Sequence, residues 1–182
     1  MEITNGWLDQ ARRCPSPNCD ERAGDRLDLI VIHNISLPPG EFGGPGIDQL
    51  FTNTLDPSEH PYYASIAGMR VSAHLLIRRN GECVQYVPFD LRAWHAGESR
   101  FGERTACNEF SVGIELEGTD DLPYETEQYE CLATVVKTLI NAYPDLDGQR
   151  IAGHSDIAPG RKTDPGDAFD WTRFRRSLQA LQ

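Results

Sequence analysis

The chain has few of the features that mark secreted, membrane or nucleic-acid-binding proteins. Lysine and arginine number only 17 against 28 acidic residues in 182, and the net charge of −11 opposes the basic footprint of a nucleic-acid binder. No apolar run approaches the roughly 20 residues that cross a bilayer. Residues 1–7 show neither the basic start nor the apolar segment of an export signal. We therefore expect a cytoplasmic protein that binds neither nucleic acid nor membrane and whose partner is a small soluble molecule.

Cysteine is also scarce. The five cysteines are odd in number and scattered, unlike a disulfide framework, and Cys14 and Cys19 lack the second Cys or His pair of a zinc knuckle. The sequence has no internal repeat and no low-complexity linker, and its 39% hydrophobic content suffices for one core. It therefore predicts a single domain over residues 1–182. Because no apolar surface helix is obvious, we expect a monomer.

Hydrophobic periodicity predicts the secondary structure. Asn80-Gly81 between two apolar runs is typical of a β-hairpin, and residues 111–118 alternate with a period of two. Residues 126–142 keep helical spacing, with Thr126 as candidate N-cap. These patterns predict strands at 27–33, 73–78, 82–87, 111–118 and 150–153 and helices at 6–13, 47–54, 126–142 and 170–181. Strands before and after long helices, with one hairpin, imply an α/β fold with a mixed central β-sheet flanked by helices.

Two histidines stand where an apolar strand ends, which is where ligands bind to open α/β sheets. His33 closes the run 27–33, and His154 opens a segment, 154–166, that two prolines and two glycines make a turn-rich loop. With Asp164 they offer two imidazoles and one carboxylate, a zinc set with a fourth tetrahedral position left for water. The alternative is a polar loop with an incidental histidine, and spacing alone does not decide between them.

A carboxylate interrupts the apolar strand predicted at 111–118. Glu115 stands between two apolar residues, where burial would raise its pKa as suits a general acid or base. An exposed face shared with Glu117 describes the pattern just as well. Lys162, in the turn-rich segment, could stabilise the oxyanion of an amide under attack.

Several blocks of the sequence match one known family, in order and over nearly the whole chain. The blocks are Gly6-Trp7-Leu8, 31–40, Val71-Ser72-Ala73-His74, 93–97, 113–118 and 154–166. On these residues the chain closely resembles the AmpD-type N-acetylmuramyl-L-alanine amidases, zinc enzymes of the type-2 amidase superfamily. The resemblance implies one zinc ion held by His33, His154 and Asp164, with Glu115 and Lys162 as the catalytic pair. It implies hydrolysis of the amide between 1,6-anhydro-N-acetylmuramic acid and L-alanine in cytoplasmic cell-wall recycling, which limits β-lactamase induction.

The resemblance also implies contacts with the muropeptide substrate. Their candidates are Asn34, Arg70, Trp94, His95 and Arg104. The family often carries an arginine directly before the Cys-Asn-Glu-Phe-Ser block, where this chain has Ala106. Either Arg104 replaces that arginine or recognition of the stem peptide is weaker at this point.

Three other interpretations stay open beside this one. A binding module with the same fold would lack a ligand or the acid/base, and all five positions are present here. A periplasmic amidase would need an export signal. A structural zinc site would need a fourth protein ligand, for which His95 or Asp156 is available, although the family pattern leaves that position to water and gives Asp156 a loop-capping role. His60 and His74 are expected to be structural histidines.

Overall fold

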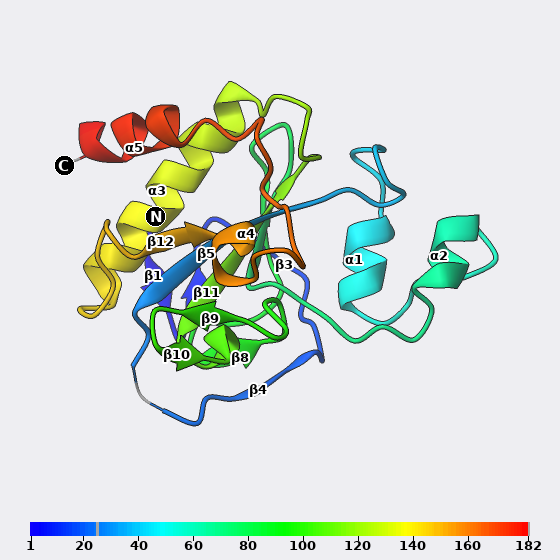
Figure 1. Ribbon diagram of the computed structural model, residues 1–182, viewed down its shortest axis with the longest axis horizontal. Coiled ribbons are helices and arrows are strands. Elements are labelled where there is room, and N and C mark those ends of the chain that lie inside the picture. The colour runs from blue at the N-terminus through cyan, green and yellow to red at the C-terminus, as the bar shows by residue number, and fades with distance from the viewer. Residues whose placement is uncertain (25, 182) are drawn as a thin grey trace.

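A six-stranded sheet forms the centre of the computed structural model, which describes residues 1–24 and 26–181 (Figure 1). Its strands lie in the order β12-β5-β11-β6-β7-β3. Their bounds are β3 Arg12–Arg13, β5 Leu29–Ile35, β6 Leu75–Ile77, β7 Cys83–Gln85, β11 Ser111–Glu117 and β12 Ile151–Gly153. β6 and β7 pair antiparallel, and the other neighbouring strands pair in parallel. The predicted mixed sheet is confirmed.

Two helices, α3 (Thr126–Ala142) and α5 (Trp171–Ala180), lie side by side against one face of this sheet (Figure 1). The helical spacing of α3 turns its apolar side chains toward the alternate residues of β5 and β11 that point to this face. The shared core includes Ile30, Ile32, Val112, Ile114, Leu116, Leu132, Val136 and Leu139. The helix predicted at 126–142 is confirmed. Its N-cap is Glu125 rather than Thr126, because Glu125 and Gln128 form a capping box.

The opposite face of the sheet is covered by short elements and loops. Helices α1 (Gly46–Phe51) and α2 (Pro61–Ser65) form a lobe beside the sheet (Figure 1). The remaining elements are β1 Ile3–Thr4, β2 Trp7–Leu8, β4 Cys19–Glu21, β8 Leu91–Ala93, β9 Arg100–Phe101, β10 Arg104–Thr105, the 3₁₀ helix η1 Cys107–Glu109 and α4 His154–Ile157. All seven residues of β11 are buried as a result. The exposed-face interpretation of Glu115 and Glu117 is therefore wrong.

The prediction of a helix at 6–13 is also wrong. Gly6 adopts a left-handed φ of 75°, and a Cβ there would lie 2.8 Å from the Asp90 carboxylate. The Leu8 N–H donates to the buried Gln85 side chain at 2.7 Å, β2 pairs antiparallel with the adjacent β1, and β3 pairs with the distant β7, so this segment forms strands instead of a helix. The hairpin around Asn80-Gly81 is confirmed, with Gly81 at φ 82°.

Smaller differences concern the loops. The helical turn expected at 47–54 spans Gly46–Phe51. Helix α2 was not expected. It begins at Pro61, and the His60 ring accepts the Tyr62 N–H at 3.1 Å. His60 is thus structural, as expected. The first turn of the segment 154–166 is the helix α4 rather than a loop. None of the helices in residues 1–24 and 26–181 combines the length and apolarity needed to cross a membrane.

Candidate metal centre and active site

The sheet places the first two functional side chains next to each other. His33 on β5 and Glu115 on β11 are register partners in a parallel pair, so their side chains point to the same face, opposite α3 and α5. β12 pairs with the other side of β5 and leads directly into His154, the first residue of α4. His33, Glu115 and His154 therefore lie toward the carboxyl ends of three adjacent parallel strands.

The loop after α4 brings Asp164 back to the two histidines. Its backbone C=O accepts the Ser155 N–H at 2.9 Å, and the Gly153 N–H donates to the Asp156 carboxylate at 2.7 Å. Asp156 thus caps α4, as the family pattern suggested. A side chain at Gly166, where φ is 80°, would place its Cβ 2.1 Å from the Asp120 Cα, so the chain after Asp164 turns tightly against the loop that follows β11.

Three possible ligand atoms converge at this point. His33 Nδ1 and His154 Nδ1 are 2.9 Å apart, and they lie 3.1 and 3.0 Å from Asp164 Oδ2. The His154 Nε2 faces the Ala96 C=O at 3.2 Å; it donates there, which leaves a lone pair on Nδ1. Burial lowers the pKa of His33 to about 4, so its ring is neutral at pH 7. Two imidazole nitrogens and a carboxylate oxygen gathered in this way form a candidate metal site.

Glu115 is buried beside these ligands. Burial raises the pKa of Glu115 well above its usual range, nearby Asp164 raises it further, and Lys162 opposes the shift. Its Oε2 has no hydrogen-bond partner among the described residues. Glu117, two residues on, is satisfied instead: its carboxylate accepts the Gly43 N–H at 2.7 Å and the Arg78 guanidinium at 3.0 Å. Of the two glutamates, only Glu115 has the unpaired oxygen expected of a proton carrier.

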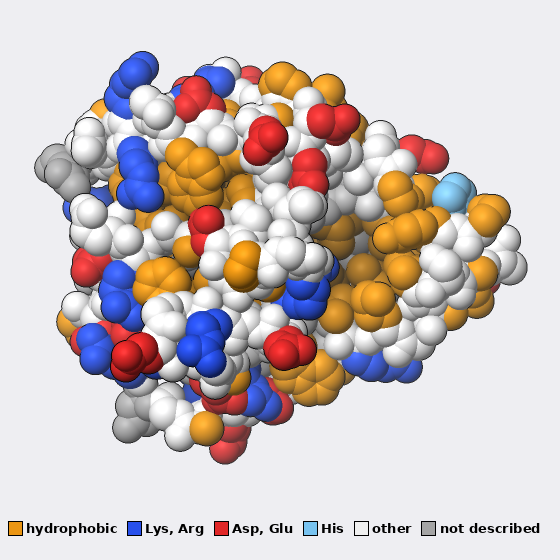
Figure 2. Space-filling model, in the orientation of Figure 1, with side chains coloured by type: hydrophobic (Ala, Val, Ile, Leu, Met, Phe, Trp, Pro, Cys, Tyr) orange, Lys and Arg blue, Asp and Glu red, His pale blue; other side chains and the backbone are white. Residues whose placement is uncertain are grey.

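A cleft of about 370 Å³ opens over the metal ligands. One wall carries His33, Glu115, Lys162 and Asp164, and the other carries apolar residues that include Leu50, Phe51, Ile66 and Met69. Figure 2 shows the apolar side chains gathered over the lobe formed by α1 and α2, beside a hollow between this lobe and the body. The cleft thus places a charged, reactive wall opposite an apolar one.

Comparison with known proteins decides the family. Residues 23–167 match the model of the N-acetylmuramoyl-L-alanine amidases. The chain belongs to this family. The amidase is 62% identical to the 1,6-anhydro-N-acetylmuramyl-L-alanine amidase AmpD of Escherichia coli K12, over 96% of each chain.

Solved structures agree with this assignment. The crystal structure of a selenomethionine AmpD derivative superposes with a TM-score of 0.95 at 60% identity, covering 98% of this chain and 99% of the other. A complex of the amidase AmiD from E. coli with the substrate anhydro-N-acetylmuramic acid-L-Ala-D-gamma-Glu-L-Lys gives a TM-score of 0.60 at 28% identity, covering 97% and 65%. The expected family and α/β fold are confirmed.

The amidase brings some of the proposed substrate contacts to the cleft. Asn34 and Trp94 line it. The Asn34 amide nitrogen already donates to Asp120 at 2.7 Å, and the Trp94 indole donates to Asp20 at 3.0 Å, so both are held by the protein. Arg70 is exposed at the rim, between the lining residues Met69 and Val71.

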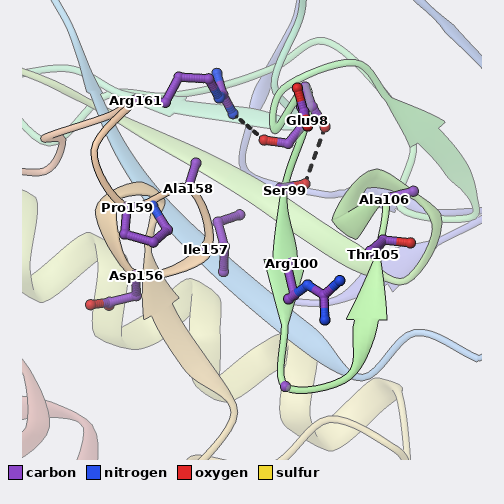
Figure 3. Close-up of a pocket in the computed structure, with 12 residues that line it drawn as sticks. Glu98, Ser99, Arg100, Thr105, Ala106, Asp156, Ile157, Ala158, Pro159 and Arg161 are labelled. Carbon is purple, nitrogen blue, oxygen red and sulfur yellow. Dashed lines mark hydrogen bonds between the residues drawn. The ribbon is translucent and has the colours of Figure 1, made fainter.

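Arg104 is held elsewhere. Its guanidinium donates to both oxygens of Asp28 at 2.8 Å and lies over the Phe110 ring. A second cavity of about 910 Å³ borders the amidase loops at Gly97 and Asp156, and Ala106 lines it together with Arg100 and Arg161 (Figure 3). The structure thus places Arg100 and Arg161, rather than Arg104, in the cavity that Ala106 lines.

Two residues that were not identified from the sequence hold backbone segments near the site in place. Asn108 Oδ1 accepts the backbone N–H groups of His95 and Ala96 at 3.2 and 2.8 Å. The half-buried Arg22 guanidinium donates to the C=O groups of Asn108 and Ser111 at 2.9 Å, and desolvation lowers its pKa to about 10. The Asn108 position is part of a recognised block, whereas nothing in the local sequence distinguishes Arg22. His74 is structural, as expected: its Nδ1 accepts the Gly113 N–H at 3.0 Å.

Proposed function

We propose that this amidase is a zinc enzyme that hydrolyses the bond between 1,6-anhydro-N-acetylmuramic acid and the L-alanine of small soluble muropeptides. The observation that carries the proposal is the convergence of His33 Nδ1, His154 Nδ1 and Asp164 Oδ2 beside the buried, unpaired Glu115. A proton carrier next to such a donor set is the arrangement that metal-assisted hydrolysis requires.

The donor set fits zinc. Neutral imidazoles and a carboxylate are its usual ligands, and three protein ligands leave one position open, as in catalytic rather than structural sites. Gathering lone pairs at about 3 Å with no donor between them is unfavourable without a cation. His33, His154 and Asp164 would hold the ion, which when bound supplies a Lewis acid that activates water and polarises the carbonyl.

Glu115 and Lys162 would move the proton and balance the charge. Glu115 would accept the proton of the attacking water at its unpaired oxygen and deliver it to the leaving nitrogen of L-alanine. Its elevated pKa suits this double role, because a raised carboxyl pKa favours holding the proton between the two transfers. The Lys162 ammonium, on the same wall of the cleft, would face the negative charge that develops on the carbonyl oxygen.

The substrate assignment is supported by the relatives and by the cleft. The E. coli relative is named for the anhydromuramyl-L-alanine bond, and the AmiD complex contains an anhydromuropeptide. The apolar wall on α1 and α2 suits contact with a sugar face, and the net charge of −11 disfavours adsorption to an anionic polymer. We infer a small soluble fragment as substrate, a cytoplasmic role in cell-wall recycling, and a monomeric enzyme. By removing muropeptides, the enzyme would limit β-lactamase induction.

The proposal is tested by incubating the zinc-loaded protein with anhydromuramyl-tripeptide and identifying the products by mass spectrometry. We expect free tripeptide and anhydromuramic acid. Binding of the muropeptide without release of tripeptide, in protein that carries one zinc per chain, would mean that the chain is a recognition module instead. The Asp164→Ala variant is the matched control, because it removes a ligand and leaves Glu115 and Lys162 in place.

A further inference from the structure

His95 was a candidate for substrate contact, yet both nitrogens of its ring are already engaged inside the protein. Its Nδ1 lies 2.9 Å from His33 Nε2, and its Nε2 lies 3.1 Å from the Ser111 hydroxyl. The Ser111 hydroxyl in turn lies 2.6 Å from the Cys107 C=O. Four groups therefore form one continuous chain of hydrogen bonds that ends at a candidate metal ligand.

The proton positions along this chain of hydrogen bonds follow from the Cys107 C=O, at the end opposite His33. A carbonyl oxygen cannot donate, so the single Ser111 proton goes to Cys107, and the Ser111 oxygen accepts from His95 Nε2. A neutral His95 that carries its proton on Nε2 has a lone pair on Nδ1. His33 Nε2 must then donate to it, which leaves the lone pair of His33 on Nδ1, the atom that faces His154 and Asp164.

The surroundings of His95 are shaped to hold it in this place. The His95 ring lies on the bare backbone of Gly113, where a Cβ would come within 2.4 Å of the His95 Cγ. Asn108 fixes the backbone of His95 and Ala96, as described above. The same loop also orients the second imidazole, because the Ala96 C=O receives the His154 Nε2 proton at 3.2 Å.

We propose that His95 is a positioning residue that, with Ser111, holds His33 in the tautomer whose Nδ1 is free to bind the metal. The proposal rests on the metal site of the proposed function. It replaces the expectation that His95 is a fourth ligand or hydrogen-bonds the substrate, since either role would break the chain. Partners behind a ligating histidine typically change metal affinity about 10- to 100-fold when they are removed.

Zinc affinity of the Ser111→Ala variant tests this role, measured by competition with a chromophoric chelator. Ser111 lies two hydrogen bonds away from His33, the candidate metal ligand, and lines neither cavity. We expect about 10-fold weaker zinc binding. Ser16→Ala is the matched control, because Ser16 is a buried serine that also donates to a backbone C=O, that of Phe51 on the apolar wall of the cleft, and has no hydrogen bond to His33, His154 or Asp164. The control should bind zinc with unchanged affinity and lose similar thermal stability without metal.

Imidazole nitrogen NMR on the wild-type protein gives a second readout that does not depend on a variant folding. Both with and without zinc, His95 should carry its proton on Nε2 and none on Nδ1. Protonation of His95 on Nδ1, or undiminished zinc affinity in Ser111→Ala, would overturn the inference. Failure of the proposed function looks different: the wild-type protein would bind no zinc or release no tripeptide, whatever the His95 tautomer.

Discussion

Acid should destabilise the metal-free protein strongly, because several of its histidines are buried in neutral form. Burial lowers the pKa of His33 to about 4 and that of His74 to about 3, whereas an unfolded histidine titrates near 6.5. Between these pH values the unfolded chain binds protons at these histidines and the native protein does not. The free energy of unfolding is therefore at its full value above about pH 6.5 and falls as the pH decreases.

The size of the loss follows from the two shifts. Each histidine contributes up to about 1.4 kcal/mol per pH unit within its window. Through His33 and His74 together, lowering the pH from 8 to 5 should reduce the free energy of unfolding by about 4 kcal/mol. Burial lowers the pKa of His95 as well, which adds to the loss. This is a large part of the roughly 5–15 kcal/mol that stabilises a typical domain.

Urea unfolding of metal-free protein at pH 8, 7, 6 and 5, followed by circular dichroism, measures this dependence. In His74→Asn the difference between pH 8 and pH 5 should shrink by about 2 kcal/mol, since one proton-binding group is gone. The quantity compared is the change in the free energy of unfolding between pH 8 and pH 5 within each protein. Any stability that the variant loses at every pH because the ring is missing therefore cancels. A wild-type difference below about 1 kcal/mol, or an unchanged difference in His74→Asn, would refute the burial argument.

Three substitutions test the site itself. Glu115→Gln should keep one zinc per chain and lose about 10²- to 10⁴-fold in kcat, because only the proton carrier is removed; retained turnover would assign that role to another group. Lys162→Ala should fold, bind zinc and turn over about 10²- to 10³-fold more slowly, and an unchanged kcat would remove Lys162 from the mechanism. Gly113→Ala should lower the free energy of unfolding by about 1–3 kcal/mol and weaken zinc binding, because the new methyl group displaces the His95 ring; calorimetry and chelator competition measure the two effects, and wild-type values for both would contradict the packing described here.

Local periodicity made much of the fold predictable from the sequence. The alternation at 111–118 and the helical spacing at 126–142 are dictated by neighbouring residues, and the structure has strand β11 and helix α3 there. The helix expected at 6–13 failed for the opposite reason. Its conformation depends on Gly6 and on the buried Gln85 side chain, which lies far along the chain. Short segments tied to distant partners carry little local signal.

The candidate site divides in a similar way. The motifs, taken together, predicted that His33, His154 and Asp164 share one metal site. The convergence of their side chains in the structure agrees with that prediction. The environment of Glu115 could not be read from alternation, since a period of two does not reveal what covers the second face. The ion pair of Arg104 could not be predicted from the sequence, because its partner, Asp28, lies 76 residues away along the chain. The role of His95 emerged only from hydrogen-bond geometry.

Zinc titration of the metal-free wild-type protein tests the central claim most directly, with bound metal and the rate of tripeptide release from anhydromuramyl-tripeptide followed in the same samples. If His33, His154 and Asp164 form a single catalytic metal site, the rate rises in proportion to bound zinc and levels off at one ion per chain. Full activity in metal-free protein, or one bound zinc per chain with no tripeptide released, would contradict the account.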